Sequence, residues 1–221
     1  MKKSFLVVGL GAFGEAVART LHSQGHTVMA VDIRRDRVER AREITSEAVE
    51  GNATDRATVE QVVENLGAED IEAAVVAVGQ RLDASILVCL FLKELGVKRI
   101  VAKVLTDDHA QILKQLGVGE TVFPEADSGA RLAHRLARPN LVDLLPLGGG
   151  VGVYEVTAPA EFVGSTLGEL KLRNRYEMMV IAIRPNNSDE VEMMPGADTA
   201  IREGDLLVVL GTQKAIEKIS S

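Results

Sequence analysis

Three glycines near the start of the chain have the spacing Gly-x-Gly-x-x-Gly, which is typical of a phosphate-binding loop. Gly9, Gly11 and Gly14 lie between an apolar run at residues 5–8 and a segment whose apolar residues repeat at helical spacing. In such a loop the first glycine permits a tight turn, the second lets the backbone approach a phosphate, and the third lets the helix pack on the strand. Free N–H groups at the helix start would then face the phosphates.

An acidic residue, Asp32, stands at the end of the next apolar run. A carboxylate at this position accepts hydrogen bonds from the ribose hydroxyls of a bound nucleotide. Arg34 and Arg35 follow and would suit a 2′-phosphate, but Asp32 would repel one. The glycines and Asp32 therefore predict that adenosine binds at the first strand-loop-helix.

Small and polar residues stand where the other strands are expected to end. Ligands of a doubly wound sheet bind beyond the carboxyl ends of its strands, so we expect these residues in one pocket. Lys103 would place a cation near the phosphates, although an exposed lysine at a strand end would have the same local sequence. The predicted nucleotide-binding residues are Gly9, Gly11, Ala12, Phe13, Gly14, Asp32, Ile33, Asn52, Ala53, Thr54, Ala77, Val78, Gly79 and Lys103.

Glu125 is an unexpected member of the same edge, because a carboxylate aimed at a phosphate would repel it. A divalent cation between the two would remove the conflict, since Mg²⁺ and Ca²⁺ take oxygen ligands from carboxylates and phosphates. A glutamate that stabilises a helix N-terminus would occupy the same position. Glu125 is therefore both a candidate metal ligand and a candidate helix-terminal residue.

The elements that must position these residues alternate regularly along residues 1–138. The predicted fold is α/β, a Rossmann doubly wound parallel sheet of six strands with intervening helices. The expected strands are residues 5–8, 27–31, 48–50, 73–78, 99–104 and 121–123, and the expected helices follow Gly11 and Arg34 and cover residues 55–66, 82–95, 106–116 and 126–137.

The pattern changes after Arg138. Pro139, Pro146 and three glycines at 148–150 predict a linker at residues 139–150. Residues 151–221 predict a smaller α+β domain, which at this size we expect to dimerise. Its expected strands are residues 151–156, 178–183 and 206–210, with helices at 167–176 and at the end of the chain.

Composition narrows the class of protein. The 221 residues carry a net charge of -7 and only 3% aromatic residues, so we expect no nucleic-acid partner. Cys89, the single cysteine, lies in an apolar run and predicts a buried thiol. No uncharged stretch reaches the roughly 18 residues of a spanning helix. We therefore expect a cytoplasmic protein with any membrane role exerted through a partner.

Several motifs taken together resemble a known family, the RCK domains of KtrA/TrkA-type subunits of bacterial potassium uptake systems. In the first 138 residues the resemblance is carried by residues 9–14 (GLGAFG), 31–32 (VD), 51–54 (GNAT), 77–79 (AVG) and 123–125 (FPE). Residues 163–167 and 202–209 are similar to the smaller RCK C-terminal domain. One copy of each domain resembles the Ktr arrangement more than the doubled Trk arrangement.

The resemblance implies a regulatory subunit rather than an enzyme. Such subunits form homodimers that assemble into an octameric ring beneath a KtrB/TrkH-like membrane subunit that translocates potassium. ATP favours the active state and ADP the inactive one, with a divalent cation near the glutamate that matches Glu125. Some relatives bind NAD(H) in the same place, and some bind cyclic di-AMP in the C-terminal domain. There Arg173, Asn174 and Arg175 could meet a phosphate, but a solvated basic cluster is the favoured interpretation of these three residues.

One position departs from the family pattern. Ktr members often carry an arginine that reaches the terminal phosphate where this chain has Ala12. Loss of that arginine removes a fork of charged donors. Arg19, Arg34, Arg81 or a neighbouring chain would have to supply the charge.

Two other functions fit the same fold. An NAD-dependent oxidoreductase needs an acid or base beside the nicotinamide, and neither Tyr154 nor Tyr176 has a lysine four residues later. The four histidines fall on expected helices or turns rather than at strand ends. The third alternative is a stand-alone nucleotide sensor with a soluble partner.

Overall fold

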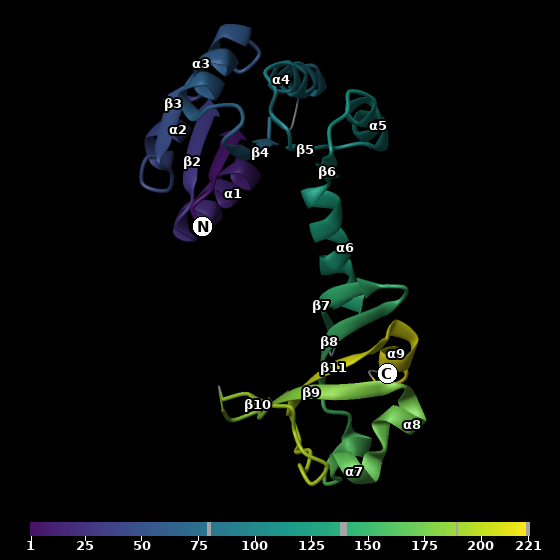
Figure 1. Cartoon of the computed structure of the whole chain (residues 1–221). Coiled ribbons are helices and arrows are strands. Elements are labelled where there is room, and N and C mark those ends of the chain that lie inside the picture. The colour runs from purple at the N-terminus through teal and green to yellow at the C-terminus, as the bar shows by residue number, and fades with distance from the viewer. Residues whose placement is uncertain (79–80, 138–140, 189, 220–221) are drawn as a thin grey trace. The chain divides into compact units, whose positions relative to one another are not determined.

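The computed structural model describes residues 1–78, 81–137, 141–188 and 190–219 (Figure 1). The chain divides into two compact units, Met1–Ala126 and Asp127–Ser221. Within the described ranges, no helix is both long and apolar enough to cross a membrane.

The first unit is built on a six-stranded parallel sheet, as predicted. The strand order is β3-β2-β1-β4-β5-β6, so the order reverses between β1 and β4. In a doubly wound sheet this reversal opens a crevice for ligands at the carboxyl ends of the strands. The strands are β1 (Ser4–Val8), β2 (Thr27–Asp32), β3 (Glu47–Glu50), β4 (Ile71–Val76), β5 (Ile100–Lys103) and β6 (Glu120–Val122).

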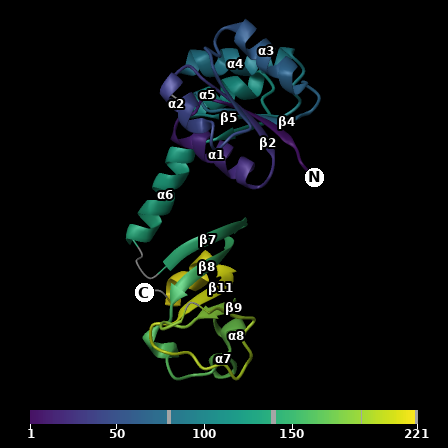
Figure 2. The same cartoon turned by 90° about the vertical axis from the view of Figure 1, so that its left-hand side faces the viewer.

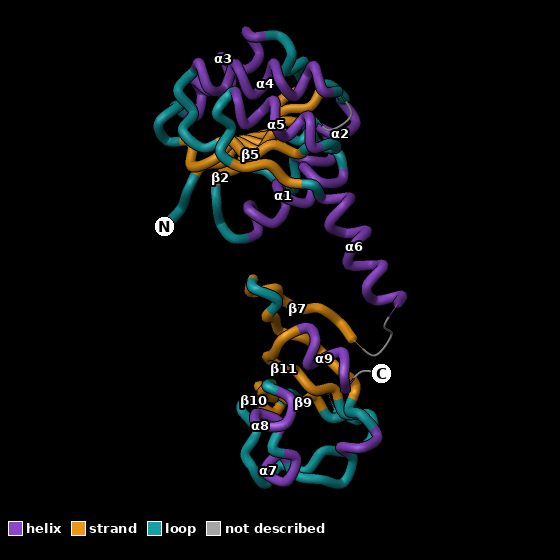
Figure 3. Tube along the Cα trace, turned by 90° about the vertical axis from the view of Figure 1, so that its right-hand side faces the viewer, coloured by secondary structure: helices purple, strands orange, loops and turns teal. Residues whose placement is uncertain are grey.

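Helices cover both faces of this sheet. They are α1 (Ala12–Ser23), α2 (Arg35–Ala41), α3 (Arg56–Leu66), α4 (Leu82–Glu94), α5 (Asp107–Gln115) and α6 (Pro124–Ala137), the last of which contains the boundary between the units. In Figures 2 and 3, α3 and α4 lie on one side of the sheet and α1 on the other. The strands are therefore buried on both faces, which explains their nearly continuous apolar sequences.

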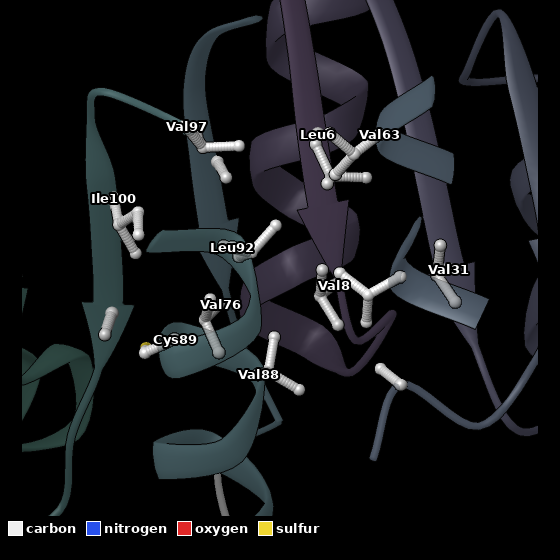
Figure 4. Close-up of a cluster of buried hydrophobic side chains, with 14 of the residues drawn as sticks. Leu6, Val8, Val31, Val63, Val76, Val88, Cys89, Leu92, Val97 and Ile100 are labelled. Carbon is white, nitrogen blue, oxygen red and sulfur yellow. The ribbon is translucent and has the colours of Figure 1, made fainter. Parts of the chain in front are cut away.

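Alternate residues of β1 belong to the two cores. Leu6 and Val8 pack with residues of α3, α4 and α5, whereas Val7 packs with residues of α1 and α2. Figure 4 shows Val8 and Val31 facing Val88 of α4 in the first of these cores. Cys89 is buried there, as predicted, and burial raises the pKa of its thiol to about 12.

The second unit contains a five-stranded antiparallel sheet with the order β10-β9-β11-β8-β7 (Figure 3). Phe162, Leu207 and Ile216 are fully buried in its core. The elements are β7 (Leu141–Gly148), β8 (Val151–Thr157), the 3₁₀ helix η1 (Ala160–Phe162), α7 (Leu167–Leu170), α8 (Leu172–Tyr176), β9 (Met178–Arg184), β10 (Glu192–Met193), β11 (Leu206–Thr212) and α9 (Gln213–Ile219).

The segment predicted as a linker, residues 139–150, is mostly a strand. Residues 138–140 lie outside the described ranges, but Leu141–Gly148 forms β7 and pairs antiparallel with β8. Pro146 is tolerated because β7 is an edge strand, where a missing N–H breaks no ladder. Gly149 and Gly150 have positive φ and form the hairpin turn between the two strands. Pro146 and the three glycines that suggested a linker therefore belong to an edge strand and its turn, while Pro139 lies outside the described residues.

The helix predicted at residues 167–176 is also different. It is divided into α7 and α8 at Lys171, whose φ of 48° is left-handed. The two-residue strand β10 was not predicted, because so short a segment has no readable apolar alternation.

Candidate functional site: a nucleotide pocket at the sheet crevice

A cavity of about 510 Å³ lies at the carboxyl ends of the strands in the first unit. Its volume is within the range of small-molecule sites. Its lining residues come from the ends of five strands, the loops that follow them and the helices α1, α2 and α4: Val8, Gly9, Gly11, Ala12, Val31, Asp32, Ile33, Arg37, Gly51, Asn52, Ala53, Thr54, Ala77, Val78, Arg81, Ala84, Val88 and Lys103.

Most of the predicted nucleotide-binding residues lie together in this cavity. Two do not line it: Phe13 packs into the core with α1 and α2, and Gly14 is buried in α1. Gly79 lies outside the described residues. Glu125 does not line the cavity, although its partner Lys103 does.

The glycine loop is held by direct backbone packing. Gly9 has a φ of 98°, and a Cβ there would lie 2.9 Å from the carbonyl carbon of Ala77. A Cβ on Gly14 would lie 1.9 Å from the carbonyl oxygen of Gly9. At Gly11, by contrast, a Cβ would meet no described atom within 4 Å. The protein itself therefore requires the first and third glycines, while the second leaves open space beside the loop.

Asp32 connects the ends of β1 and β2. It is 6% exposed, its Oδ2 accepts a hydrogen bond from the Leu10 N–H at 2.6 Å, and its Oδ1 accepts one from the Arg34 N–H at 2.8 Å. Arg37 of α2 places Nη1 3.3 Å from Oδ2. Each carboxylate oxygen has two lone pairs, so Asp32 can hold the loop and still accept a bond from a ligand hydroxyl.

Lys103 and Glu125 form an ion pair at the ends of β5 and β6. The Lys103 side chain is 13% exposed, whereas Glu125 is 63% exposed. The hydrogen bond from Lys103 lowers the pKa of Glu125 below its usual value. In the described residues, no group of three or more His, Cys, Asp or Glu side chains is arranged to hold a metal. This single carboxylate is therefore not a complete metal site by itself.

Asn52 and Thr54 form a local turn at the edge of the cavity. The Asn52 Oδ1 accepts hydrogen bonds from the Thr54 N–H at 3.1 Å and from the Thr54 hydroxyl at 2.8 Å. Arg37 is a lining residue that sequence reasoning missed. Arg37 lies near the start of α2, and the sequence alone does not distinguish it from the neighbouring arginines.

The second unit contains a separate cavity of about 810 Å³. Its lining is mostly apolar and includes Met178, Met179 and Val180, with Arg173 and Asn174 of α8 among the polar residues. Arg175 instead stacks on the ring of Tyr176. The structure thus brings two of the three predicted phosphate-facing residues to this cavity.

Comparison with known proteins identifies the family. Residues 5–124 match the family model for the TrkA-N domain, and residues 151–221 match that for the TrkA-C domain. The chain is also 38% identical over 218 residues to Ktr system potassium uptake protein C of Bacillus subtilis, an alignment that covers 99% of this chain and 96% of the relative. The chain belongs to the KtrA/TrkA family.

A second relative supports the family, and a solved structure shares the fold. Ktr system potassium uptake protein A of Vibrio alginolyticus is 34% identical over 220 residues, with 99% of this chain and 97% of the relative covered. The GsuK channel bound to NAD has the same fold, with a TM-score of 0.63 at 22% identity. The match covers 100% of this chain and 40% of the channel chain.

Proposed function

We propose that this chain is the nucleotide-binding regulatory subunit of a Ktr/Trk-type potassium uptake system. The observation that carries the proposal is the full-length identity to Ktr system potassium uptake proteins, since both units align without a missing part. The cavity supports it, because its lining contains the glycine loop and an acidic ribose partner on the same sheet. In this role the chain is not an enzyme.

The proposed ligands are ATP and ADP, with NAD(H) as the alternative. All three share the adenosine that Asp32 would bind through its ribose. NAD is bound in the GsuK channel, a protein with the same fold. The residues proposed to contact nucleotide are the predicted set, including Gly79 and also Phe13 and Gly14, which act by shaping the loop.

A divalent cation, Mg²⁺ or Ca²⁺, is proposed as part of the ligand complex rather than as a resident metal. Glu125 would supply one oxygen ligand and the phosphates would supply others, after Lys103 moves away from the carboxylate. In the second unit, cyclic di-AMP is the proposed ligand of the larger cavity, where Arg173 and Asn174 would face its phosphates.

The proposed assembly is a homodimer that builds an octameric ring in the cytoplasm, at the inner face of the membrane, on a KtrB/TrkH-like subunit. A ligand shifts a two-state ring only by its differential affinity for the two states. If each of four coupled dimers gains about 0.7 kcal/mol, the sum of about 3 kcal/mol changes the population roughly a hundredfold. Small local preferences at each cavity would therefore control transport.

The test is potassium uptake in cells that lack their own uptake systems. We expect the chain to co-purify with a Ktr-type membrane subunit and to raise its uptake rate, and we expect Asp32→Ala to associate equally well but to lose the response to ATP and ADP. The Asp205→Ala variant is the matched control, because it removes a buried carboxylate far from the cavity in sequence. Failure to associate with any such subunit, or consumption of NADH with a small aldehyde or ketone, would overturn the proposal.

A further inference from the structure

The glycine loop of this chain lacks the charged side chain that a terminal phosphate needs. Ala12, the first residue of α1, is exposed and lines the cavity with a methyl group. The N-terminus of α1 has a glycine at its cap and no side-chain hydrogen bond from that residue, so its N–H groups are available to an anion. A formal positive charge on the phosphates of a nucleotide would come from another element.

Three arginines near the first unit's cavity differ in where they point. Arg19 pairs with Glu15 one turn back on α1, at 2.9 Å, and does not line the cavity. Arg34 donates from both Nε and Nη2 to Asp36 and also does not line it. Arg81 does line the cavity. Of these three, the structure therefore selects Arg81.

Ala12 and Arg81 line the same cavity from the N-termini of two helices, α1 and α4. The loop after β1 and the loop after β4 touch directly, because a Cβ on Gly9 or Gly14 would meet atoms of Ala77 at 2.9 and 3.1 Å. Four residues after Ala77, Arg81 caps the N-terminus of α4, and its carbonyl accepts the first helical bond from Ser85 at 3.0 Å. Arg81 thus lies at the start of the helix that follows β4, and the glycine loop packs against Ala77 at the end of the same strand.

The guanidinium of Arg81 is oriented by a neighbour. Its Nε lies 3.2 Å from Oδ1 of Asp83 and its Nη2 lies 2.5 Å from Oδ2, a two-point contact that fixes the plane of the group. The side chain is 69% exposed, so an anion can reach it. A guanidinium carries five N–H donors, and Asp83 occupies one edge of the fork.

Arg37 and Lys103, which also line the cavity, are paired with carboxylates as Arg81 is, but their side chains are only 32% and 13% exposed. Arg37 contacts Asp32, at the end where the ribose is proposed to bind, and Lys103 contacts Glu125. We infer that Arg81 binds the β- or γ-phosphate of a bound adenine nucleotide and so supplies the charge that Ala12 does not. The inference rests on the proposed function, because it assigns a role within the same cavity.

The experiment is calorimetric titration of the full chain with AMP, ADP and ATP. We expect Arg81→Gln to weaken ATP binding about tenfold, the effect of one charge-assisted hydrogen bond, and to leave AMP binding unchanged. Arg19→Gln and Arg34→Gln are matched controls that should bind all three nucleotides as the parent does. Adding Ala12→Arg to Arg81→Gln should restore tight ATP binding, since the two side chains would face the same phosphates.

The outcomes separate this inference from the proposed function. If the parent binds none of the nucleotides, the proposed function fails. If the parent binds ATP and Arg81→Gln keeps the parent's ratio of AMP to ATP dissociation constants, the role of Arg81 is wrong. Arg81→Lys provides a second measurement should the glutamine variant fold poorly, because it keeps the charge, loses the fork, and should give an intermediate ratio.

Discussion

Each unit contains one buried aspartate that accepts hydrogen bonds from two backbone N–H groups. Asp32 binds the N–H groups of Leu10 and Arg34, and Asp205 binds those of Asn186 and Arg202 at 3.3 and 2.8 Å. Asp205 is 3% exposed and does not line the large cavity of its unit, whereas Asp32 lines the cavity of the first. The same pair of hydrogen bonds closes a turn in the second unit and holds the glycine loop in the first.

The difference lies in what surrounds the two carboxylates. Asp32 stands at the point where the strand order reverses, so space opens beside it, and Arg37 comes from the next helix to share its charge. Asp205 precedes β11, which lies between β9 and β8 in an antiparallel sheet, and it lines neither of the two cavities described above. A buried, hydrogen-bonded aspartate is therefore evidence of a ligand site only when the topology also provides a cavity.

The largest expected effect tests whether the loop held by Asp32 has a single allowed shape. Gly14→Ala would put a Cβ 1.9 Å from the Gly9 carbonyl oxygen, and we expect a loss of roughly 3 kcal/mol in the free energy of unfolding together with loss of nucleotide binding. Gly11→Ala is the matched control, because its Cβ meets no described atom within 4 Å. It should unfold within about 0.5 kcal/mol of the parent yet bind nucleotide more weakly. Urea unfolding measures the stability of each variant, and calorimetry measures its nucleotide affinity. Equal stability of Gly14→Ala and Gly11→Ala would contradict the close packing of Gly14 on Gly9.

The next effect compares the two aspartates directly. Asp32→Ala and Asp205→Ala each leave two backbone donors without their acceptor, and we expect each to lose about 2 kcal/mol of stability. Thermal unfolding with and without ATP should then separate them. ATP should raise the melting temperature of the parent and of Asp205→Ala, but not that of Asp32→Ala, since a ligand stabilises only a fold that binds it. An equal change in melting temperature with ATP for Asp32→Ala and Asp205→Ala would contradict the different roles of the two aspartates.

The smallest expected effect is a pH dependence of the free energy of unfolding that arises in the first unit. His109 of α5 is 4% exposed, and burial lowers its pKa below the ordinary value. The folded state keeps this imidazole neutral, so the full stability is present above about pH 6.5 and is lost as the pH falls below it. We expect the free energy of unfolding, measured by urea unfolding, to fall between pH 7.5 and 5.5.

One variant tests the assignment to His109. His109→Gln should flatten the pH profile, because it removes the buried imidazole. Residues 141–221 contain no histidine, so their unfolding should not show this dependence. A profile unchanged by His109→Gln would refute the assignment.

The sheet of the first unit was predictable because its signals are local. The sequence shows an apolar run at each strand, helical spacing between the runs and the glycine motif after the first. These signals agree on six strands alternating with helices along the chain. The positions of Asp32, Asn52 and Lys103 in one cavity followed from topology alone, since parallel strands bring their carboxyl ends to one edge.

What could not be predicted depends on contacts between distant residues. Arg37 reaches Asp32 only because α2 turns back over β2, and no spacing rule selects it from the neighbouring arginines. The pairing of Lys103 with Glu125 likewise depends on the register of β5 and β6. In the second unit, β7 was read as a linker because proline and glycine carry the same local signal in an edge strand, a hairpin turn and a connection.

The β7–β8 hairpin has a consequence for anyone who separates the two units. The TrkA-C match begins at Val151, the first residue of β8, so a fragment cut there would lose the strand that covers one side of β8. The exposed row of N–H and C=O groups would be a template for pairing with another chain. Such a fragment would self-associate through an artificial edge, and its dimerisation would report on the cut rather than on the protein. A fragment that begins before Leu141 keeps its own edge strand and is the sound material for ligand or assembly measurements.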